Sequence, residues 1–287
     1  MKLRIVCVLY KNENDFENLL NSIAANVRTE TEIVLWNNSD HREQIGRYIR
    51  TNTSFPHKIH VFGDGNNIGF AKAANAAAKQ RTGEDFEFLL FINPDSLITS
   101  EIKPPHLEEV KASPGLYGLR VFDNPEKTKR QANARNFPKL LTSIAGREGL
   151  LTRAFPNNRL SSTYLGSALA DDQTTKVDWV SGSAMLTTHQ IWEKIEGYDD
   201  RYFLYCEDVD LGRKAQKLDI PAFYYPFIDV VHAIKGSSEN SKHLADFYHH
   251  SGMWKYYLKW TPSYLKLLSP LVLIGIWSRY LLRRVLK

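Results

Sequence analysis

Three carboxylates crowd the start of a helical pattern in the stretch GYDDRYFLYCEDVDLGRKAQ, residues 197–216. They are Glu207, Asp208 and Asp210. A carboxylate within hydrogen-bond reach of a hydroxyl group can act as its general base. Carboxylates in the first turn of a helix are also stabilised by the helix dipole, with Asp210 then on the exposed face. The stretch alone leaves both interpretations open.

An aspartate and a histidine end two other apolar runs. Asp95 closes FEFLLFINPD, residues 86–95, and His232 closes IPAFYYPFIDVVH, residues 220–232. Mg²⁺ is often bound by one or two carboxylates and the phosphates of a substrate, and imidazole suits Mn²⁺ as a further ligand. Asp95 and His232 are therefore candidate ligands of Mg²⁺ or Mn²⁺. A turn-capping aspartate and a structural histidine are the alternatives.

A turn rich in glycine and asparagine opens into an alanine-rich helix in GDGNNIGFAKAANAA, residues 63–77. Small residues let the backbone approach a ligand, and the free N–H groups at a helix start can bind phosphate. The spacing matches neither the GxGxxG dinucleotide fingerprint nor a P-loop. A tight turn with a closely packed helix is the alternative.

The elements that must position these groups alternate between strand and helix. Apolar, β-rich runs predict strands at 3–10, 32–40, 58–64 and 86–95, and helical spacing predicts helices at 13–27, 41–51 and 69–81. Such alternation predicts right-handed βαβ units around a parallel sheet, whose ligands bind beyond the carboxyl ends of the strands. A functional loop with a short helix near 138–153 is expected within 123–176, before a new strand at 176.

The composition is that of a folded protein with an uneven charge. The chain has 287 residues, 43% of them hydrophobic and 24% charged, and a net charge of +5. Because the basic residues neither cover the body nor accompany a known motif, nucleic acid is not expected as a partner. Cys7 and Cys206 lack metal-ligand or disulfide spacing, and Cys7 is expected to be a buried thiol. The N-terminus is too quickly polar for a signal peptide, which favours a reducing, cytoplasmic compartment.

The C-terminal stretch 264–287 is apolar and basic. Residues 255–287 carry seven Lys or Arg and no Asp or Glu. The longest uncharged run, 267–278, has twelve residues, short of the ~20 that a transmembrane helix needs. We therefore expect an interfacial helix on an anionic membrane surface. A helix packed on the domain, or on a partner subunit of a homo-oligomer, is the alternative.

Seven motifs follow one another in this chain: VLYKNEN, VLWNNSD, GNNIGFAKAAN, LLFINPD, VDWVSGSAML, GYDDRYFLYCEDVDLGRKAQ and VVH. Together, within residues 3–260, they resemble the family 2 glycosyltransferases, inverting enzymes of the GT-A fold, in their bacterial rhamnosyltransferase-like branch. The resemblance implies an α/β fold with a Rossmann-like nucleotide-binding sheet, mostly parallel, and helices on both faces. It also implies a GT-A domain at 1–260, with a donor half at 1–100 and a catalytic half at 101–260, before the tail at 261–287.

The resemblance implies a nucleotide-sugar donor and assigns residues to it. The base and ribose pocket is implied at Leu9, Tyr10, Asn12, Asn38 and Ser39. Contacts to the ribose, diphosphate and metal region are implied at Asn67, Gly69, Phe70, Lys72, Asn75 and Asn93. The wall where donor sugar and acceptor meet is implied at Asp178, Trp179, Gly182 and Ser183.

The same likeness implies the chemistry. Asp208 is the implied base for the acceptor hydroxyl, and Glu207 orients the acceptor or the loop. Asp95 is the implied ligand of the divalent metal, with His232 as the second, although the family often has a fuller DxD here. Three aromatic residues, Tyr198, Phe203 and Tyr205, are expected either to stack on sugars or to anchor the loop.

The stretch 136–165 resembles the rhamnosyltransferase branch and so favours dTDP-L-rhamnose as donor over a UDP-sugar carrying galactofuranose, galactose or N-acetylhexosamine. The implied acceptor is a lipid-linked or growing cell-surface polysaccharide, and the implied location is the inner face of a bacterial cell membrane. A nucleotidyltransferase would need a glycine-rich signature with Arg and Lys at the N-terminus, which VLYKNEN lacks. A binding module without activity is disfavoured by the intact Glu207–Asp208 pair.

Overall fold

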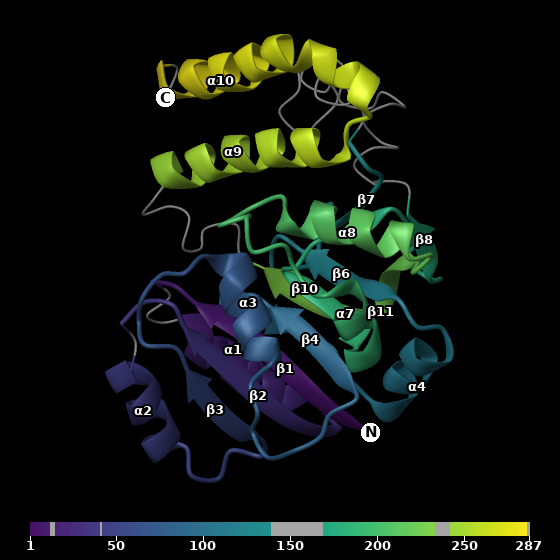
Figure 1. Ribbon diagram of the computed structural model, residues 1–287. Helices are drawn as coiled ribbons and strands as arrows, with labels where there is room; N and C mark the ends of the chain where they lie inside the picture. The colour runs from purple at the N-terminus through teal and green to yellow at the C-terminus, as the bar shows by residue number, and fades with distance from the viewer. Residues whose placement is uncertain (12–14, 41, 139–168, 233–241, 286–287) are drawn as a thin grey trace.

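A computed structural model describes residues 1–11, 15–40, 42–138, 169–232 and 242–285. Its first half is a parallel sheet with crossover helices, as predicted (Figure 1). The strands are β1 (Lys2–Leu9), β2 (Glu30–Asn37), β3 (Lys58–Phe62) and β4 (Phe88–Ile92), in the order β3-β2-β1-β4. The helices between them are α1 (Asp15–Asn26), α2 (Arg42–Thr51) and α3 (Phe70–Ala78). Both faces of β1 are buried, which explains its unbroken apolar run.

The second half extends the sheet with mixed directions. Its strands are β5 (Ser96–Ile98), β6 (Leu116–Phe122), β8 (Thr175–Val177), β10 (Ala184–Thr188) and β11 (Ala222–His232). Strand β10 lies antiparallel between β4 and β6, while β6 and β11 are parallel. A separate small sheet pairs β7 (Ala134–Arg135) with β9 (Trp179–Val180). The single strand expected from residue 176 is therefore three short strands, because the chain turns at 181–183 to pass from one sheet to the other.

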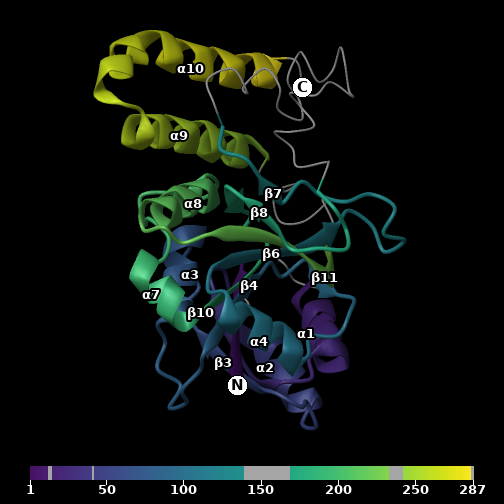
Figure 2. The same ribbon diagram turned by 90° about the vertical axis from the view of Figure 1, so that its right-hand side faces the viewer.

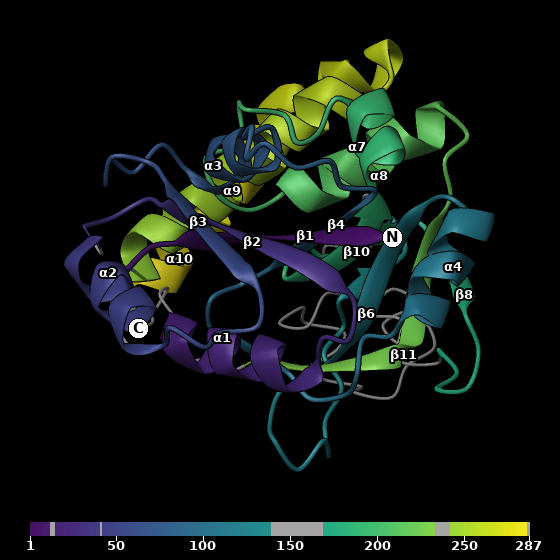
Figure 3. The ribbon, with the colours of Figure 1, turned by 90° about the horizontal axis from the view of Figure 1, so that it is seen from below.

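Helices cover both faces of the main sheet, as Figures 2 and 3 show. One face carries α1, α2 and α4 (Pro104–Ala112), and the other carries α3, α7 (His189–Ile195) and α8 (Glu207–Lys217). Alternate residues of β1 supply the two cores: Ile5 and Cys7 face the first set of helices, and Val6 and Val8 face the second. Cys7 is fully buried as expected, and burial raises the pKa of its thiol. The expected short helix near 138–153 falls almost wholly outside the described residues.

A helical hairpin stands on the α8 side of the body. Helix α9 (Lys242–Trp260) lies over α8, and η3 (Ser263–Leu268) leads into α10 (Ser269–Val285), which runs back along the outer side of α9 (Figure 1). Ile276 is buried in the seam between the two long helices. The rings of Phe247 and Trp277 lie 5.7 Å apart, and those of His250 and Tyr280 lie 5.5 Å apart. The hairpin is thus held together by aromatic contacts.

The contact between α9 and the body is expected to weaken in acid. Burial, reinforced by His250, Arg279 and Arg283 and opposed by Asp246, lowers the pKa of His249 to about 4. The imidazole, whose ring edge meets Tyr205, therefore stays neutral in the fold, whereas an unfolded histidine is charged below about pH 6.5. Its contribution to stability is present above that pH and is lost as the pH falls from about 6.5 to 4.

Denaturant unfolding of the wild type and of His249→Gln between pH 7.5 and 4.5 checks this expectation. The wild type should lose stability relative to the variant over that range, by an amount on the order of 1 to 3 kcal/mol. Because the other titrating groups are shared, the difference between the two curves isolates His249. Parallel curves would contradict the assignment.

Candidate active site

The acid pair begins α8 in a buried and crowded setting. Glu207 is 6% exposed, and its Oε2 has no hydrogen-bond partner among the described residues. Asp208 accepts a hydrogen bond at Oδ1 from the N–H of Val209 at 2.8 Å. The two preceding residues, Tyr205 and Cys206, both have left-handed backbone angles, with φ of 67° and 69°. The chain thus turns sharply to present two neighbouring carboxylates at a helix start.

The electrostatics of the pair favour a proton acceptor. Burial, and then the adjacent Asp208 carboxylate, raise the pKa of Glu207 well above its ordinary value. Burial also raises the pKa of Asp208, opposed by the Val209 N–H and by Arg135. Two adjacent carboxylates that have lost most of their water resist being ionised together. The pair therefore holds a proton more tightly than a free carboxylate and is a stronger base once ionised.

The wall beside the pair is closely packed. A Cβ on Gly182 would lie 2.6 Å from Tyr198 Oη, and one on Gly212 would lie 2.4 Å from the Cβ of Trp179. Trp179 donates from Nε1 to Asn136 O at 3.0 Å. Gly212 thus lets β9 lie directly against α8, and Gly182 lets the 182–183 turn lie against Tyr198.

Two predicted wall residues have backbone partners. Asp178 accepts the N–H of Phe137 at 2.7 Å, and Ser183 accepts the N–H of Asn93 at its carbonyl at 3.1 Å. The second contact ties the wall to the end of β4, next to the candidate metal ligands. Sugar contacts by Asp178, Trp179, Gly182 and Ser183 stay predictions.

The two candidate metal ligands lie side by side. His232 Nε2 is 3.1 Å from Asp95 Oδ1 and 3.3 Å from Asn93 Nδ2. The pairing of β5 with β11 brings them together, since it sets Ser96, the residue after Asp95, opposite His232. In the described part of the chain, no cluster of three or more Asp, Glu, His or Cys residues could hold a metal. Further ligands would have to be phosphate or water, as is usual for Mg²⁺.

Gln131 completes this arrangement behind the histidine. Its Oε1 lies 3.3 Å from His232 Nδ1, and its Nε2 donates to His232 O at 2.8 Å. With Gln131 accepting the Nδ1 proton, the lone pair of Nε2 faces Asp95, which is the orientation that a metal-ligating histidine needs. Asp95 and His232 therefore fit a divalent cation with oxygen and nitrogen ligands.

The turns of the donor half meet beyond the carboxyl ends of β1 and β2. Leu9 O accepts the N–H of Asn38 at 2.9 Å, and Asn38 Nδ2 donates to Asn67 Oδ1 at 2.9 Å. Asn67 Oδ1 also accepts the N–H of Gly69 at 3.0 Å. Ser39 Oγ accepts the N–H of residue 11 at 2.8 Å. The predicted pocket residues are thus assembled at one edge of the sheet.

The remaining predicted donor residues lie on or near α3, apart from two in the turns. Tyr10 is half-buried beside this edge, and Asn12 lies outside the described residues. Lys72 is exposed on α3, while the ring of Phe70 lies 5.8 Å from that of Tyr198. Contacts of these residues with a nucleotide sugar stay predictions.

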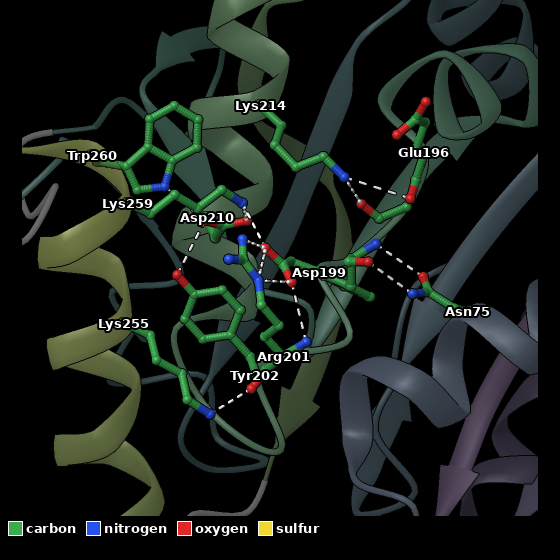
Figure 4. A network of polar contacts seen from close by, with 12 residues as sticks. Asn75, Glu196, Asp199, Arg201, Tyr202, Asp210, Lys214, Lys255, Lys259 and Trp260 are labelled. Carbon is green, nitrogen blue, oxygen red and sulfur yellow. Dashed lines mark hydrogen bonds and ion pairs between the residues drawn. The ribbon is translucent and has the colours of Figure 1, made fainter.

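Asn75 has a structural partner that the sequence did not indicate. It accepts the N–H of Tyr198 at 2.9 Å and donates to Tyr198 O at 2.8 Å and to Asp200 Oδ1 at 2.7 Å (Figure 4). Its side chain therefore ties α3 to the 197–200 loop, and its predicted contact with the diphosphate stays untested.

The loop aromatics make contacts within the protein. Phe203 stacks on Tyr248 of α9 at 4.3 Å, Tyr205 meets His249 edge-on at 5.7 Å, and Tyr198 is buried. Of the two expectations for these rings, the structure favours the anchor.

Asp210 is fully buried, so the exposed position considered for it is wrong. It accepts Trp260 Nε1 at 2.6 Å, Lys259 Nζ at 2.7 Å and the hydroxyl of Tyr202 at 3.1 Å (Figure 4). Lys259 Nζ also donates to Asp199 Oδ2 at 2.7 Å. Asp210 is thus the fixed point at which α8, the 199–202 loop and α9 meet, and its contacts are structural.

Sequence reasoning missed Gln131, Lys259 and Trp260, which carry no motif and meet their partners across 49 to 101 residues of chain. Gly252 of α9, where an added Cβ would lie 2.8 Å from Tyr205 O, was also missed, although an isolated glycine inside a helical pattern can mark close packing.

The fold is shared with solved glycosyltransferase structures. GalNAc-T7, solved with UDP, GalNAc and Mn²⁺, matches with a TM-score of 0.60 at 13% identity, over 82% of this chain and 44% of that longer chain. The mannosyltransferase PcManGT from Pyrobaculum calidifontis, solved with GDP-Man and Mn²⁺, matches with a TM-score of 0.56 at 13% identity, over 99% and 75%. These likenesses confirm the predicted GT-A class of fold.

The family follows from the sequence itself. The family model described as Glycosyl transferase family 2 matches residues 5–165, more than half of the chain. The chain therefore belongs to this family and is a glycosyltransferase.

Two relatives are similar over most of their length. N-acetylglucosaminyl-diphospho-decaprenol L-rhamnosyltransferase of Mycobacterium tuberculosis is 25% identical over 278 residues, which cover 90% of this chain and 88% of the relative. Rhamnosyltransferase WbbL of Escherichia coli K12 is 25% identical over 232 residues, which cover 79% and 82%. The rhamnosyltransferase-like resemblance is thereby confirmed.

Removing either candidate metal ligand is expected to weaken nucleotide binding. Asp95→Ala and His232→Ala should each lower the affinity for dTDP or UDP in the presence of Mn²⁺ by about tenfold or more. Gln131→Ala, which removes only the partner of a ligand, should lower this affinity by no more than about 100-fold. Titration calorimetry with Mn²⁺, Mg²⁺ or EDTA measures this. Glu193→Gln, an exposed carboxylate on α7, is the control. Full-strength binding in EDTA would contradict the metal assignment.

Proposed function

We propose that this protein transfers L-rhamnose from dTDP-L-rhamnose, with inversion, to a hydroxyl group of a lipid-linked glycan on the inner face of a bacterial cell membrane. The observation that carries the reaction is the Glu207–Asp208 pair at a helix start, with Glu207 buried and Asp208 partly exposed, on a body whose sheet edge holds Asp95 beside His232. Rhamnose as the transferred sugar is supported by the names of both relatives, and a lipid-linked acceptor is supported by the name of the relative from Mycobacterium tuberculosis.

In this proposal Asp208 is the base. The acceptor hydroxyl is too weak an acid to ionise at neutral pH, so its proton passes to the Asp208 carboxylate as the oxygen bonds to the anomeric carbon. The bond from that carbon to the diphosphate oxygen breaks on the opposite face, and the nucleoside diphosphate leaves. Glu207, buried beside Asp208, keeps the basicity of the pair high and orients the loop or the acceptor.

The metal site serves the leaving group. A divalent cation held by Asp95 and His232, Mg²⁺ or Mn²⁺, would offset the negative charge that builds up on the departing diphosphate. The turns around Asn38, Asn67 and Gly69 would hold the nucleotide, since their backbone groups and amides converge at the same edge.

The competing donor is a UDP-sugar. Small differences in a pocket change sugar preference by only a few kcal/mol, so the branch likeness supports the reaction more firmly than the sugar. A calorimetric screen of dTDP-rhamnose, UDP-sugars and GDP-sugars with added Mn²⁺ discriminates between them.

Asp208→Asn is expected to remove transfer while leaving donor binding intact. The amide is close in shape to the carboxylate but cannot accept the proton, so kcat should fall at least about 10²- to 10⁴-fold. The wild-type rate should also fall as the pH drops through the raised pKa of the pair, because only the ionised base accepts a proton.

Release of nucleoside diphosphate measures turnover, and calorimetry measures donor affinity. Asp219→Asn, an exposed residue beyond the end of α8, should behave as the wild type. Unchanged turnover of Asp208→Asn would rule out the base assignment.

The outer helix supplies the proposed membrane contact. Within the described ranges, Ser263–Arg284 is the one helical stretch whose length and composition would allow it to cross a membrane. In the structure α10 instead lies along α9, with Arg283 near Asp246. Exposed apolar side chains lie on η3 at Leu267 and on α10 at Leu271, Ile274, Leu281 and Leu282. We propose that this face lies in the plane of an anionic membrane, with the Lys and Arg residues of the tail meeting lipid phosphates.

The double variant Leu271→Asp/Ile274→Asp is expected to lose binding to vesicles of anionic lipid. Charges on the apolar face oppose burial in the headgroup layer, whereas Leu218→Asp, an exposed leucine after α8, should still sediment with vesicles. High salt should release the wild type, because interfacial binding is partly electrostatic. Resistance to salt and to alkaline carbonate would indicate a spanning helix instead.

A further inference from the structure

The loop before the acid pair is held in an unfavourable conformation. The consecutive residues Tyr205 and Cys206 have φ of 67° and 69°, in the left-handed region of backbone conformation. Residues that have a Cβ atom rarely adopt this region. Two such residues in succession persist only where the surroundings determine them. Because Glu207 comes next, the direction of both carboxylates depends on whatever holds this turn.

Helix α9 packs closely against the Tyr205–Cys206 turn at a glycine, Gly252. A Cβ on Gly252 would lie 2.8 Å from Tyr205 O, 3.1 Å from Cys206 Sγ and 3.2 Å from Cys206 Cβ. The stacked Phe203–Tyr248 pair and the Tyr205–His249 contact lie one helical turn before Gly252 on α9. Only a residue without a side chain lets α9 come this near.

The opposite side of the same loop rests on the donor turn. Phe70 donates its N–H to Phe203 O at 2.7 Å, and a Cβ on Gly69 would lie 2.7 Å from that oxygen. The segment 203–206 is therefore clamped between the start of α3 and the middle of α9. One turn into α8, Asp210 bonds Lys259 and Trp260 at the far end of α9, so the helix is fixed at two places.

We propose that α9 is a positioning element for the base, with Gly252 as the positioning residue that seats it on Tyr205–Cys206 and thereby aims Glu207 and Asp208. The inference rests on the proposed function, since it assigns the aim of a base. Gly252 touches neither reacting atom, and it acts through the turn.

Gly252→Ala tests the contact of α9 with the Tyr205–Cys206 turn, and Gly275→Ala on α10 is its matched control. Both replace a helical glycine by alanine, but the added methyl group at position 275 meets nothing within 4 Å. Gly252→Ala is expected to lower kcat tenfold or more and to shift the acid limb of its pH profile, with the calorimetric Kd for dTDP and Mn²⁺ changed less than about threefold. Gly275→Ala should stay within twofold of the wild type.

A second substitution supplies a rescue. Two of the three close contacts of the added methyl group are side-chain atoms of Cys206, and a glycine there also accepts φ of 69° without strain. Gly252→Ala/Cys206→Gly should therefore recover part of the lost kcat.

The outcomes separate this inference from the proposed function. If the wild type transfers sugar and Gly252→Ala transfers it equally well, the positioning role is overturned, as it is if both glycine variants lose activity alike. If the wild type transfers nothing, the proposed function fails, but hydrogen exchange at the backbone amides of 205–210 still tests whether Gly252 holds this turn. Faster exchange in Gly252→Ala than in Gly275→Ala supports the positioning role, and equal exchange overturns it. Should Gly252→Ala not fold, Lys259→Met makes the same comparison at the other attachment, with Lys194→Met, an exposed lysine on α7, as its control.

Discussion

The buried carboxylate of Asp210 is the constraint on which the arrangement of the catalytic half depends. A charge without access to water is tolerated only when donors surround it, and here a lysine, an indole and a phenol do so. Those donors come from α9 and from the 199–202 loop, while Asp210 itself belongs to α8. Satisfying one carboxylate therefore fixes three segments relative to one another, and the acid pair lies within a turn of that point.

The fold of the first hundred residues could be predicted because its information is local. Continuous apolar strands such as β1 and helices with clear spacing form βαβ units in the order in which they occur. The second half could not, because β10 enters antiparallel between β4 and β6 and joins segments nearly a hundred residues apart. No periodicity in Ala184–Thr188 specifies that partner.

The candidate site shows the same division. Asp95 and His232 could be found because each ends an apolar run, yet their closeness depends on the three-residue strand β5 pairing with β11. Asn75 resembles a donor residue by its place in a glycine-rich motif, but its amide is engaged with Tyr198 and Asp200, more than 120 residues away. Motifs thus indicated the candidate residues, while the contacts that hold those residues in place are long-range and have no local signature.

The stacking of α10 on α9, and of α9 on α8, has a consequence for the reach of the enzyme. Packed helices lie about 8–10 Å apart, so two such layers would place the acid pair roughly 20 Å from a membrane surface if α10 binds one as proposed. A lipid-linked acceptor would then have to extend from its lipid by a comparable length before its hydroxyl met the proposed base. The hairpin would then act as a spacer that selects acceptors by length, independently of the sugar that they carry.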